Sequence, residues 1–282
     1  MSVWNEYSAD YRAEEIKEIY RAAYAGECVS VVGLSGSGKS NLLDFIASRP
    51  ELTSQYPRFV FVDCNRIAKA TSESFFRLVY EALGLYKNPD SEEISDNHWL
   101  IELDEALKHI ISSEKNICLL LERFDILIHW QDFNIVTSNL QALRVTQKYQ
   151  LTFVTATRQP LDNQTELAEL FFSHILWLGL LSKSDALWSA RRDMVRLGKT
   201  RKCTWNSQSL EKLVELSWGY PSLLRASCVA YAEGASLTLN EIRGHPSVER
   251  RVREFWQDEP EEEAVRRCGL EAHSLLGVRA KA

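Results

Sequence analysis

The feature that most constrains this chain is the stretch GLSGSGKS at residues 33–40, which fits the pattern G-x-x-x-x-G-K-[ST] at every fixed position. It follows a short β-branched run, CVSVV (28–32), and precedes an amphipathic stretch that ends before Pro50. A buried strand, a glycine-rich turn and a helix, in this order, are the context in which the pattern binds phosphate. The alternative is a flexible turn that matches the pattern by chance. Such a turn would need neither the strand before it nor the helix after it.

Each fixed position of the motif meets a demand of phosphate binding. Its glycines let the backbone turn so that successive N–H groups point at an anion, and the helix that begins near Gly38 adds its positive N-terminal end. Lys39 would reach the β- and γ-phosphates, and the Ser40 hydroxyl would bind Mg²⁺. The predicted nucleotide-binding residues of the motif are Gly33, Ser35, Gly36, Ser37, Gly38, Lys39, Ser40 and Asn41.

Apolar runs alternate with amphipathic stretches as far as residue 181, and only helical patterns follow. This alternation predicts an α/β fold, a five-stranded, mostly parallel sheet covered by helices on both faces. We expect a nucleotide-binding domain at 1–181, a helical lid domain at 182–256 and a C-terminal tail at 257–282. The expected strands are 28–33, 58–64, 116–125, 151–157 and 174–181.

A bound magnesium ion needs a second anchor from the sheet. The run CLLLERFD ends a predicted strand with Glu122, at the edge where α/β folds bind ligands. We predict that Glu122 holds the metal through a water, because Mg²⁺ takes few carboxylates and keeps several waters. The alternative is that Glu122 merely ends the strand in solvent. Asp125 either assists Glu122 or caps the helix that follows.

The fourth predicted strand ends in TFVTATRQP, which would place Thr155, Thr157 and Arg158 beside Glu122 if the two strands are neighbours. A cationic group there can contact the γ-phosphate and respond to its presence. Arg158 is therefore either a γ-phosphate sensor or an ordinary surface arginine.

Composition narrows the class of protein. No apolar run approaches the roughly 20 residues of a membrane helix, and the N-terminus lacks the features of a signal peptide, so we expect a cytoplasmic protein without membrane contact. The six cysteines form no C-x-x-C pair and are expected to be buried thiols. The net charge of −6 gives no general attraction to nucleic acid. However, residues 183–203 carry seven basic residues against two aspartates, either as a solvated helix face or as a contact to phosphate.

The glycine-rich motif, LLLERFD, VTATR and the later SWGYPSLLRA (217–226) together resemble the STAND class of P-loop NTPases, signal-transduction ATPases related to AAA+ proteins. The resemblance covers roughly residues 10–255 and implies an ASCE/AAA+-like core with a helical lid. WGYPSLL resembles the G-x-P motif of that class, which implies that Gly219 and Pro221 couple the lid to the adenine. A proline that opens a helix also has a purely structural explanation. Arg158 resembles the arginine that their fourth strand directs at the γ-phosphate.

Two departures from this class change the expectation. Many AAA+ proteins have a catalytic glutamate directly after the metal-binding acid, where this chain has Arg123. Hydrolysis should therefore be slow, with Asp125 as a less direct substitute. STAND proteins usually continue into a winged helix and sensor repeats, so the tail at 257–282 is expected to begin such a domain. The chain would then act with a partner protein, or be a shorter relative.

The sequence thus predicts a molecular switch that binds ATP or ADP with Mg²⁺ and hydrolyses ATP weakly, with Lys39, Glu122, Asp125 and Arg158 as catalytic candidates. Association with a partner or with itself is implied by the resemblance alone. One alternative is an AAA+-type DNA-associated ATPase, such as an initiator-like protein or a transposition regulator, which the basic stretch at 191–202 favours. A second is an adaptor that holds its nucleotide without hydrolysis. Adenine specificity follows from the resemblance, and the sequence contains no guanine-reading N-K-x-D motif.

Overall fold

A computed structural model describes residues 7–49, 57–86, 98–113, 116–147, 149–161, 174–197, 205–257 and 260–277. Contacts divide the chain into two compact units. The sheet unit contains Met1–Val32 and Lys39–Leu176, and the helical unit contains Gly33–Gly38 and Trp177–Ala282. The glycine loop, here residues 33–38, therefore groups with the helical unit, whereas Lys39 and Ser40 group with the sheet unit. The expected domain boundaries stay a prediction.

The described strands form one five-stranded sheet in the order β2–β3–β4–β1–β5, as the alternating pattern predicts. The β2–β3, β3–β4 and β1–β4 pairs are parallel. Every residue of β1, β3 and β4 is buried, which explains their continuous apolar sequences. The strands are β1 (Val29–Val32), β2 (Arg58–Asp63), β3 (Ile117–Glu122), β4 (Leu151–Thr157) and β5 (Ile175–Trp177).

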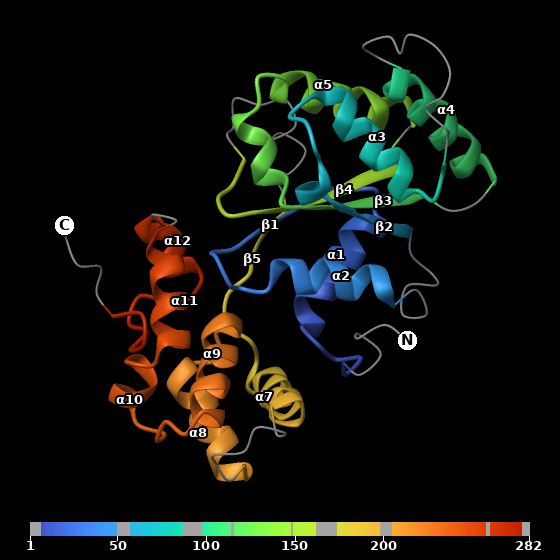
Figure 1. Cartoon of the computed structure of the whole chain (residues 1–282). Helices are drawn as coiled ribbons and strands as arrows, with labels where there is room; N and C mark the ends of the chain where they lie inside the picture. Colours follow the sequence, from blue (N-terminus) through green and yellow to red (C-terminus); the bar gives the residue numbers. More distant parts are fainter. Residues whose placement is uncertain are drawn as a thin grey trace. The chain divides into compact units, whose positions relative to one another are not determined.

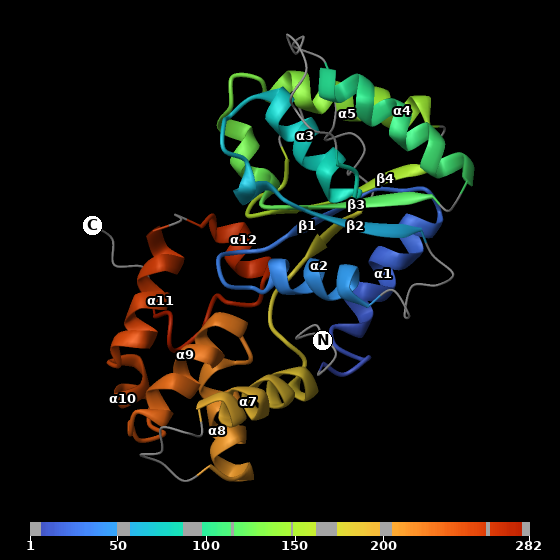
Figure 2. The same cartoon turned by 45° about the vertical axis from the view of Figure 1, so that its right-hand side comes forward.

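Helices cover both faces of the sheet (Figures 1 and 2). One face carries α1 (Ala13–Tyr24) and α2 (Lys39–Ser48), and the other carries α3 (Ser72–Ala82), α4 (His98–Ser113) and α5 (Phe133–Thr146). Two short 3₁₀ helices, η3 (Cys64–Arg66) and η4 (Phe124–His129), follow the carboxyl ends of β2 and β3. The main apolar core lies between the sheet and the helices α3–α5.

The helical unit contains six described helices, of which the last five contribute to a second apolar core. Leu216, Tyr220, Leu223 and Phe255 belong to this core, together with Leu34 of the glycine loop. The described C-terminal residues belong to it too, because Cys268, Leu270, Leu275 and Leu276 are buried in the same cluster. The helices are α7 (Lys183–Leu197), α8 (Ser207–Ser217), α9 (Pro221–Ala232), α10 (Leu239–Arg243), α11 (Pro246–Gln257) and α12 (Glu262–Arg267).

Two of the expected strands are several residues shorter in the structure. The expected strand at 116–125 ends at Glu122, and the one at 174–181 ends at Trp177. Beyond it Gly179 packs against the C-terminal segment, where an added Cβ would lie 2.6 Å from the carbonyl oxygen of Cys268. Residues 239–257 form two helices, because Gly244 ends α10 and Pro246 begins α11.

Two expectations from composition can be checked within the described ranges. Five cysteines there are buried free thiols, as expected, and Cys203 lies outside those ranges. No helix among the described residues is long and apolar enough to cross a membrane.

Candidate nucleotide-binding site

Two of the predicted metal-binding groups are hydrogen-bonded to each other. Ser40 lies in the first turn of α2, Glu122 is the last residue of β3, and the Ser40 hydroxyl donates to Glu122 Oε1 at 2.5 Å. Glu122 is only 3% exposed, so it does not end the strand in solvent. Its second carboxylate oxygen, Oε2, has no hydrogen-bond partner among the described residues. A hydroxyl beside an unsatisfied buried carboxylate is a donor set that fits Mg²⁺.

The electrostatics of Glu122 favour a bound cation. Burial raises the pKa of its carboxyl group, while the hydrogen bond from Ser40 and the charge of Lys39 lower it. Burial therefore leaves the ionised carboxylate poorly compensated by the protein groups around it. A divalent cation would offset this cost, since it is the largest local charge in such sites. Lys39, which begins α2, is itself buried.

The fourth strand is the neighbour of the third, as the predicted site requires. Leu121 is in register with Thr155, so the end of β4 lies beside Glu122. Arg158, directly after β4, pairs with Asp125, with 3.5 Å between Nε and Oδ2. A phosphate-sensing role for Arg158 stays a prediction, as does the catalytic role of Asp125.

Asp125 forms ion pairs with two arginines. The second is Arg123, with 3.6 Å between Nε and Oδ1. Arg123, and not Asp125, occupies the cap position of η4, with a left-handed φ of 56° and no side-chain capping bond. The helix that follows Asp125 is α5, whose N-cap is Asp132, so Asp125 does not cap it. The pairing with Arg123 is a contact that the sequence pattern did not predict.

The glycine loop has a backbone that requires its glycines. Gly36 and Gly38 adopt φ values of 85° and 92°, in the left-handed region that other residues rarely enter. The Ser37 N–H donates to the Leu34 carbonyl at 3.1 Å, which closes a turn inside the loop. This is the strongly curved backbone that an anion-binding nest needs.

Helix α9 is hydrogen-bonded to the carbonyl groups of this loop. The Tyr220 hydroxyl donates to the Ser35 carbonyl at 2.6 Å, and the Ser222 N–H donates to the Gly36 carbonyl at 3.2 Å. Sequence reasoning missed both residues, although Tyr220 stands within the WGYPSLL motif. The signal that could have found Tyr220 was its position, an aromatic residue between Gly219 and the helix-opening Pro221.

Pro221 occupies the first turn of α9, where its ring costs no backbone hydrogen bond. A Cβ on Gly38 would lie 3.5 Å from Pro221 Cγ, so the ring is close to the loop. Gly219 has a φ of 72°, and its Cβ would lie 3.2 Å from the Leu181 carbonyl oxygen. These contacts explain structurally why glycine and proline stand at positions 219 and 221. Their role in coupling the lid to adenine stays a prediction.

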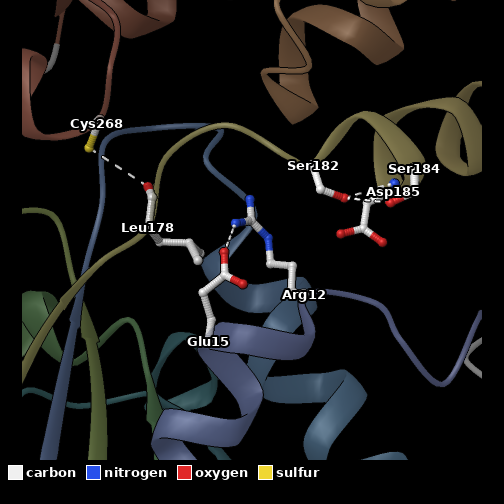
Figure 3. Close-up of polar contacts among 7 residues, drawn as sticks. All are labelled: Arg12, Glu15, Leu178, Ser182, Ser184, Asp185 and Cys268. Atoms are coloured by element: carbon white, nitrogen blue, oxygen red, sulfur yellow. Dashed lines mark hydrogen bonds and ion pairs between the residues drawn. The ribbon is translucent and has the colours of Figure 1, made fainter.

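Residues 178–182, which connect β5 to α7, contact the C-terminal segment within the helical unit. Figure 3 shows the Cys268 thiol directed at the Leu178 carbonyl oxygen, 3.7 Å away, and Ser182 at the start of α7, where its hydroxyl accepts the Asp185 N–H at 3.1 Å. In the sheet unit, the same figure shows the ion pair of the buried Arg12 with the half-buried Glu15, with 2.7 Å between Nη1 and Oε1. Asn41, the last predicted phosphate-binding residue, is exposed on α2.

No protein-family model matches the sequence, and no curated protein matches it significantly. Solved structures do resemble it. The Walker-type ATPase PABY2304 of Pyrococcus abyssi aligns with a TM-score of 0.58 and 14% identity, over 92% of this chain and 76% of that chain. The ORC1 protein of Aeropyrum pernix in complex with DNA aligns with a TM-score of 0.57 and 12% identity, over 86% of this chain and 67% of that chain.

The AAA domain of FIGL-1 in complex with ADP gives a TM-score of 0.54 and 12% identity, over 89% of each chain. At such low identities the likeness concerns the fold alone. The chain has an AAA+-like P-loop ATPase fold, with a helical region after the sheet.

Proposed function

We propose that this chain binds ATP and ADP with Mg²⁺ and hydrolyses ATP slowly. The observation that carries the proposal is the hydrogen bond between Ser40 and Glu122 at the start of α2, next to the buried Lys39. Ser40 and Glu122 would hold the ion, Lys39 would bind the phosphates, and bound Mg²⁺ would neutralise the charge of the β- and γ-phosphates. The glycine loop leads directly into these residues. The similar FIGL-1 domain, whose complex contains ADP, supports the same choice of ligand.

Slow turnover follows from the residues around Glu122. The position after it is Arg123, which cannot accept a proton from water, and the next carboxylate, Asp125, is bracketed by two arginines. A base that orients the attacking water is one of the recurring parts of ATPase sites. We therefore expect nucleotide binding to be strong relative to catalysis.

A DNA-associated ATPase is the finer function that we favour, ahead of a STAND-type signalling switch. The similar ORC1 structure is a complex with DNA. In this chain Lys183, Arg191 and Arg196 are exposed basic residues of α7, and the basic residues at 199–202 lie outside the described ranges. The net charge of −6 confines any DNA contact to a local surface of this kind. The signalling switch rests on the sequence resemblance alone.

Nucleotide binding is tested with Lys39→Ala, and Lys108→Ala serves as the control because Lys108 is an exposed lysine that pairs with Asp104 on α4. Titration with a fluorescent ATP analogue should show a loss of about 10- to 100-fold in affinity for Lys39→Ala, the worth of a charge-assisted hydrogen bond. The control should bind like the unmodified chain. Equal ATP affinity in both variants would reject the site.

DNA association is tested by titrating duplex DNA at several salt concentrations, with and without ATP. We expect Arg191→Ala with Arg196→Ala to weaken binding and to lower the salt dependence by roughly one unit for each lost phosphate contact. Arg77→Ala, an exposed arginine paired with Glu81 on α3, is the control. No DNA binding, with ATP hydrolysis intact, would favour the signalling switch. Bound ADP that survives purification, without turnover, would favour the non-hydrolysing adaptor.

A further inference from the structure

We propose that Tyr220 is a positioning residue, whose hydroxyl orients the backbone of the glycine loop for phosphate binding. The inference rests on the proposed function and assigns to it a residue that the motif does not contain. It is carried by contacts within the helical unit, to which residues 33–38 belong.

The Tyr220 hydroxyl is held in place by its surroundings. The residue is fully buried at the cap position of α9, and its ring packs edge-on against Phe255 with 6.2 Å between ring centroids. Leu34, inside the glycine loop, belongs to the same apolar core. The hydrogen bond to the Ser35 carbonyl, at 2.6 Å, therefore joins the loop to a packed core and not to a mobile side chain.

Because a peptide unit is rigid, the hydrogen bond from Tyr220 to the Ser35 carbonyl also determines where the Gly36 N–H points. The peptide between Ser35 and Gly36 is planar and trans, so its carbonyl and its N–H point in opposite directions. The bond from Tyr220 fixes the carbonyl of this peptide, and the Gly36 N–H must then point away from Tyr220. The next peptide is held at both ends, because its Gly36 carbonyl accepts the Ser222 N–H and its Ser37 N–H donates to the Leu34 carbonyl.

Fixing these peptides matters because glycine leaves the loop backbone free to rotate. A nest binds an anion only while its N–H groups converge, and glycine loses more conformational freedom than any other residue when it is ordered. Without the hydroxyl, part of that ordering would have to accompany phosphate binding. Tyr220 thus lowers the cost of binding without contacting the nucleotide.

The test replaces Tyr220 by Phe, which keeps the ring and its packing and removes the hydroxyl alone. Tyr86→Phe is the matched control, because Tyr86 is 85% exposed. We expect Tyr220→Phe to bind ATP and ADP about 10-fold more weakly, by an equal factor, since a net hydrogen bond and an unsatisfied carbonyl together have this order of effect. Without added nucleotide, amide hydrogen exchange of residues 33–38 should become faster, whereas exchange in the helices that form the apolar core should not change.

The two readouts separate a positioning role from a merely structural one. Weaker ATP binding without faster exchange of the loop, or faster exchange with ATP affinity unchanged or increased, would overturn the inference. If Tyr220→Phe melts at a lower temperature, both measurements are made well below that melting temperature. Failure of the proposed function looks different, because the unmodified chain and Lys39→Ala would then bind ATP equally.

Discussion

Gly36 lies so close to Ser222 that a β-carbon at position 36 would be 2.6 Å from the Ser222 Cβ and closer still to its hydroxyl oxygen. Contact at this distance cannot be relieved without moving either the glycine loop or the N-terminus of α9. The motif therefore requires glycine at this position for two reasons, its φ of 85° and the close approach of the Ser222 side chain.

Gly36→Ala should abolish measurable ATP binding and destabilise the helical unit. Gly84→Ala is the control for backbone strain alone, because Gly84 has a similar φ of 83° and nothing within 4 Å of an added Cβ. The control should cost about 1–2 kcal/mol of unfolding free energy, the price of a left-handed residue with a side chain. Urea unfolding and an ATP titration of both variants test this. Equal losses in the two would show that contact with Ser222 is irrelevant.

Glu122→Gln should stabilise the nucleotide-free chain and impair its function. Burial raises the pKa of Glu122, so its charge opposes folding at neutral pH, whereas glutamine can still accept the bond from Ser40. The unfolding free energy at pH 7 should therefore rise, and Mg²⁺-dependent ATP hydrolysis should be lost. Glu105→Gln, at an exposed residue of α4, is the control and should change neither. A less stable Glu122→Gln chain would contradict the electrostatic argument.

His273 should make the helical unit sensitive to acid. Burial lowers the pKa of this imidazole, which is 2% exposed, stacks on Trp218 and is hydrogen-bonded through Nε2 to the Ser217 carbonyl at 2.9 Å. The unfolded state then binds more protons than the folded state, so stability rises with pH and is lost as pH falls below the ordinary histidine pKa of about 6.5.

The measurement for His273 is the unfolding free energy between pH 7.5 and pH 5.0. In His273→Gln, the decrease over this range should be smaller than in the unmodified chain. Replacing the exposed His129 by Gln should leave the decrease as it is. An identical pH dependence in all three chains would remove His273 as its source.

Asn206 should contribute about 1 kcal/mol to the helical unit, the usual worth of an N-cap. Its side chain accepts the Ser209 N–H at 2.7 Å, and the Ser209 hydroxyl accepts the Asn206 N–H at 2.9 Å, which completes a capping box at the start of α8. Asn206→Ala should lower the melting temperature, whereas Gln208→Ala, at an exposed position in the same first turn of α8, should leave it nearly unchanged. Equal melting temperatures would mean that α8 is stabilised by packing alone.

The sequence predicted best those features that depend on residues close together in the chain, such as apolar strands and the phosphate-binding motif. The apolar runs predicted the five strands, and the spacing of Lys39 and Ser40 is a local pattern with a chemical reason. That Glu122 would approach Ser40 could be inferred because parallel strands end at one edge of the sheet. The bond from Tyr220 to Ser35 could not, since it joins residues 185 positions apart and depends on how α9 packs. The left-handed backbone of Arg123 also has no sequence signal, because arginine rarely adopts it.

The burial of the C-terminal segment bears on how small a working fragment can be. Cys268, Leu270, Leu275 and Leu276 fill the core that also contains Tyr220 and Leu34. A fragment that ended with α11 would leave this core open to water beneath the residues that support the glycine loop. The shortest fragment that can bind phosphate with native affinity should therefore include Leu276, which belongs to this core.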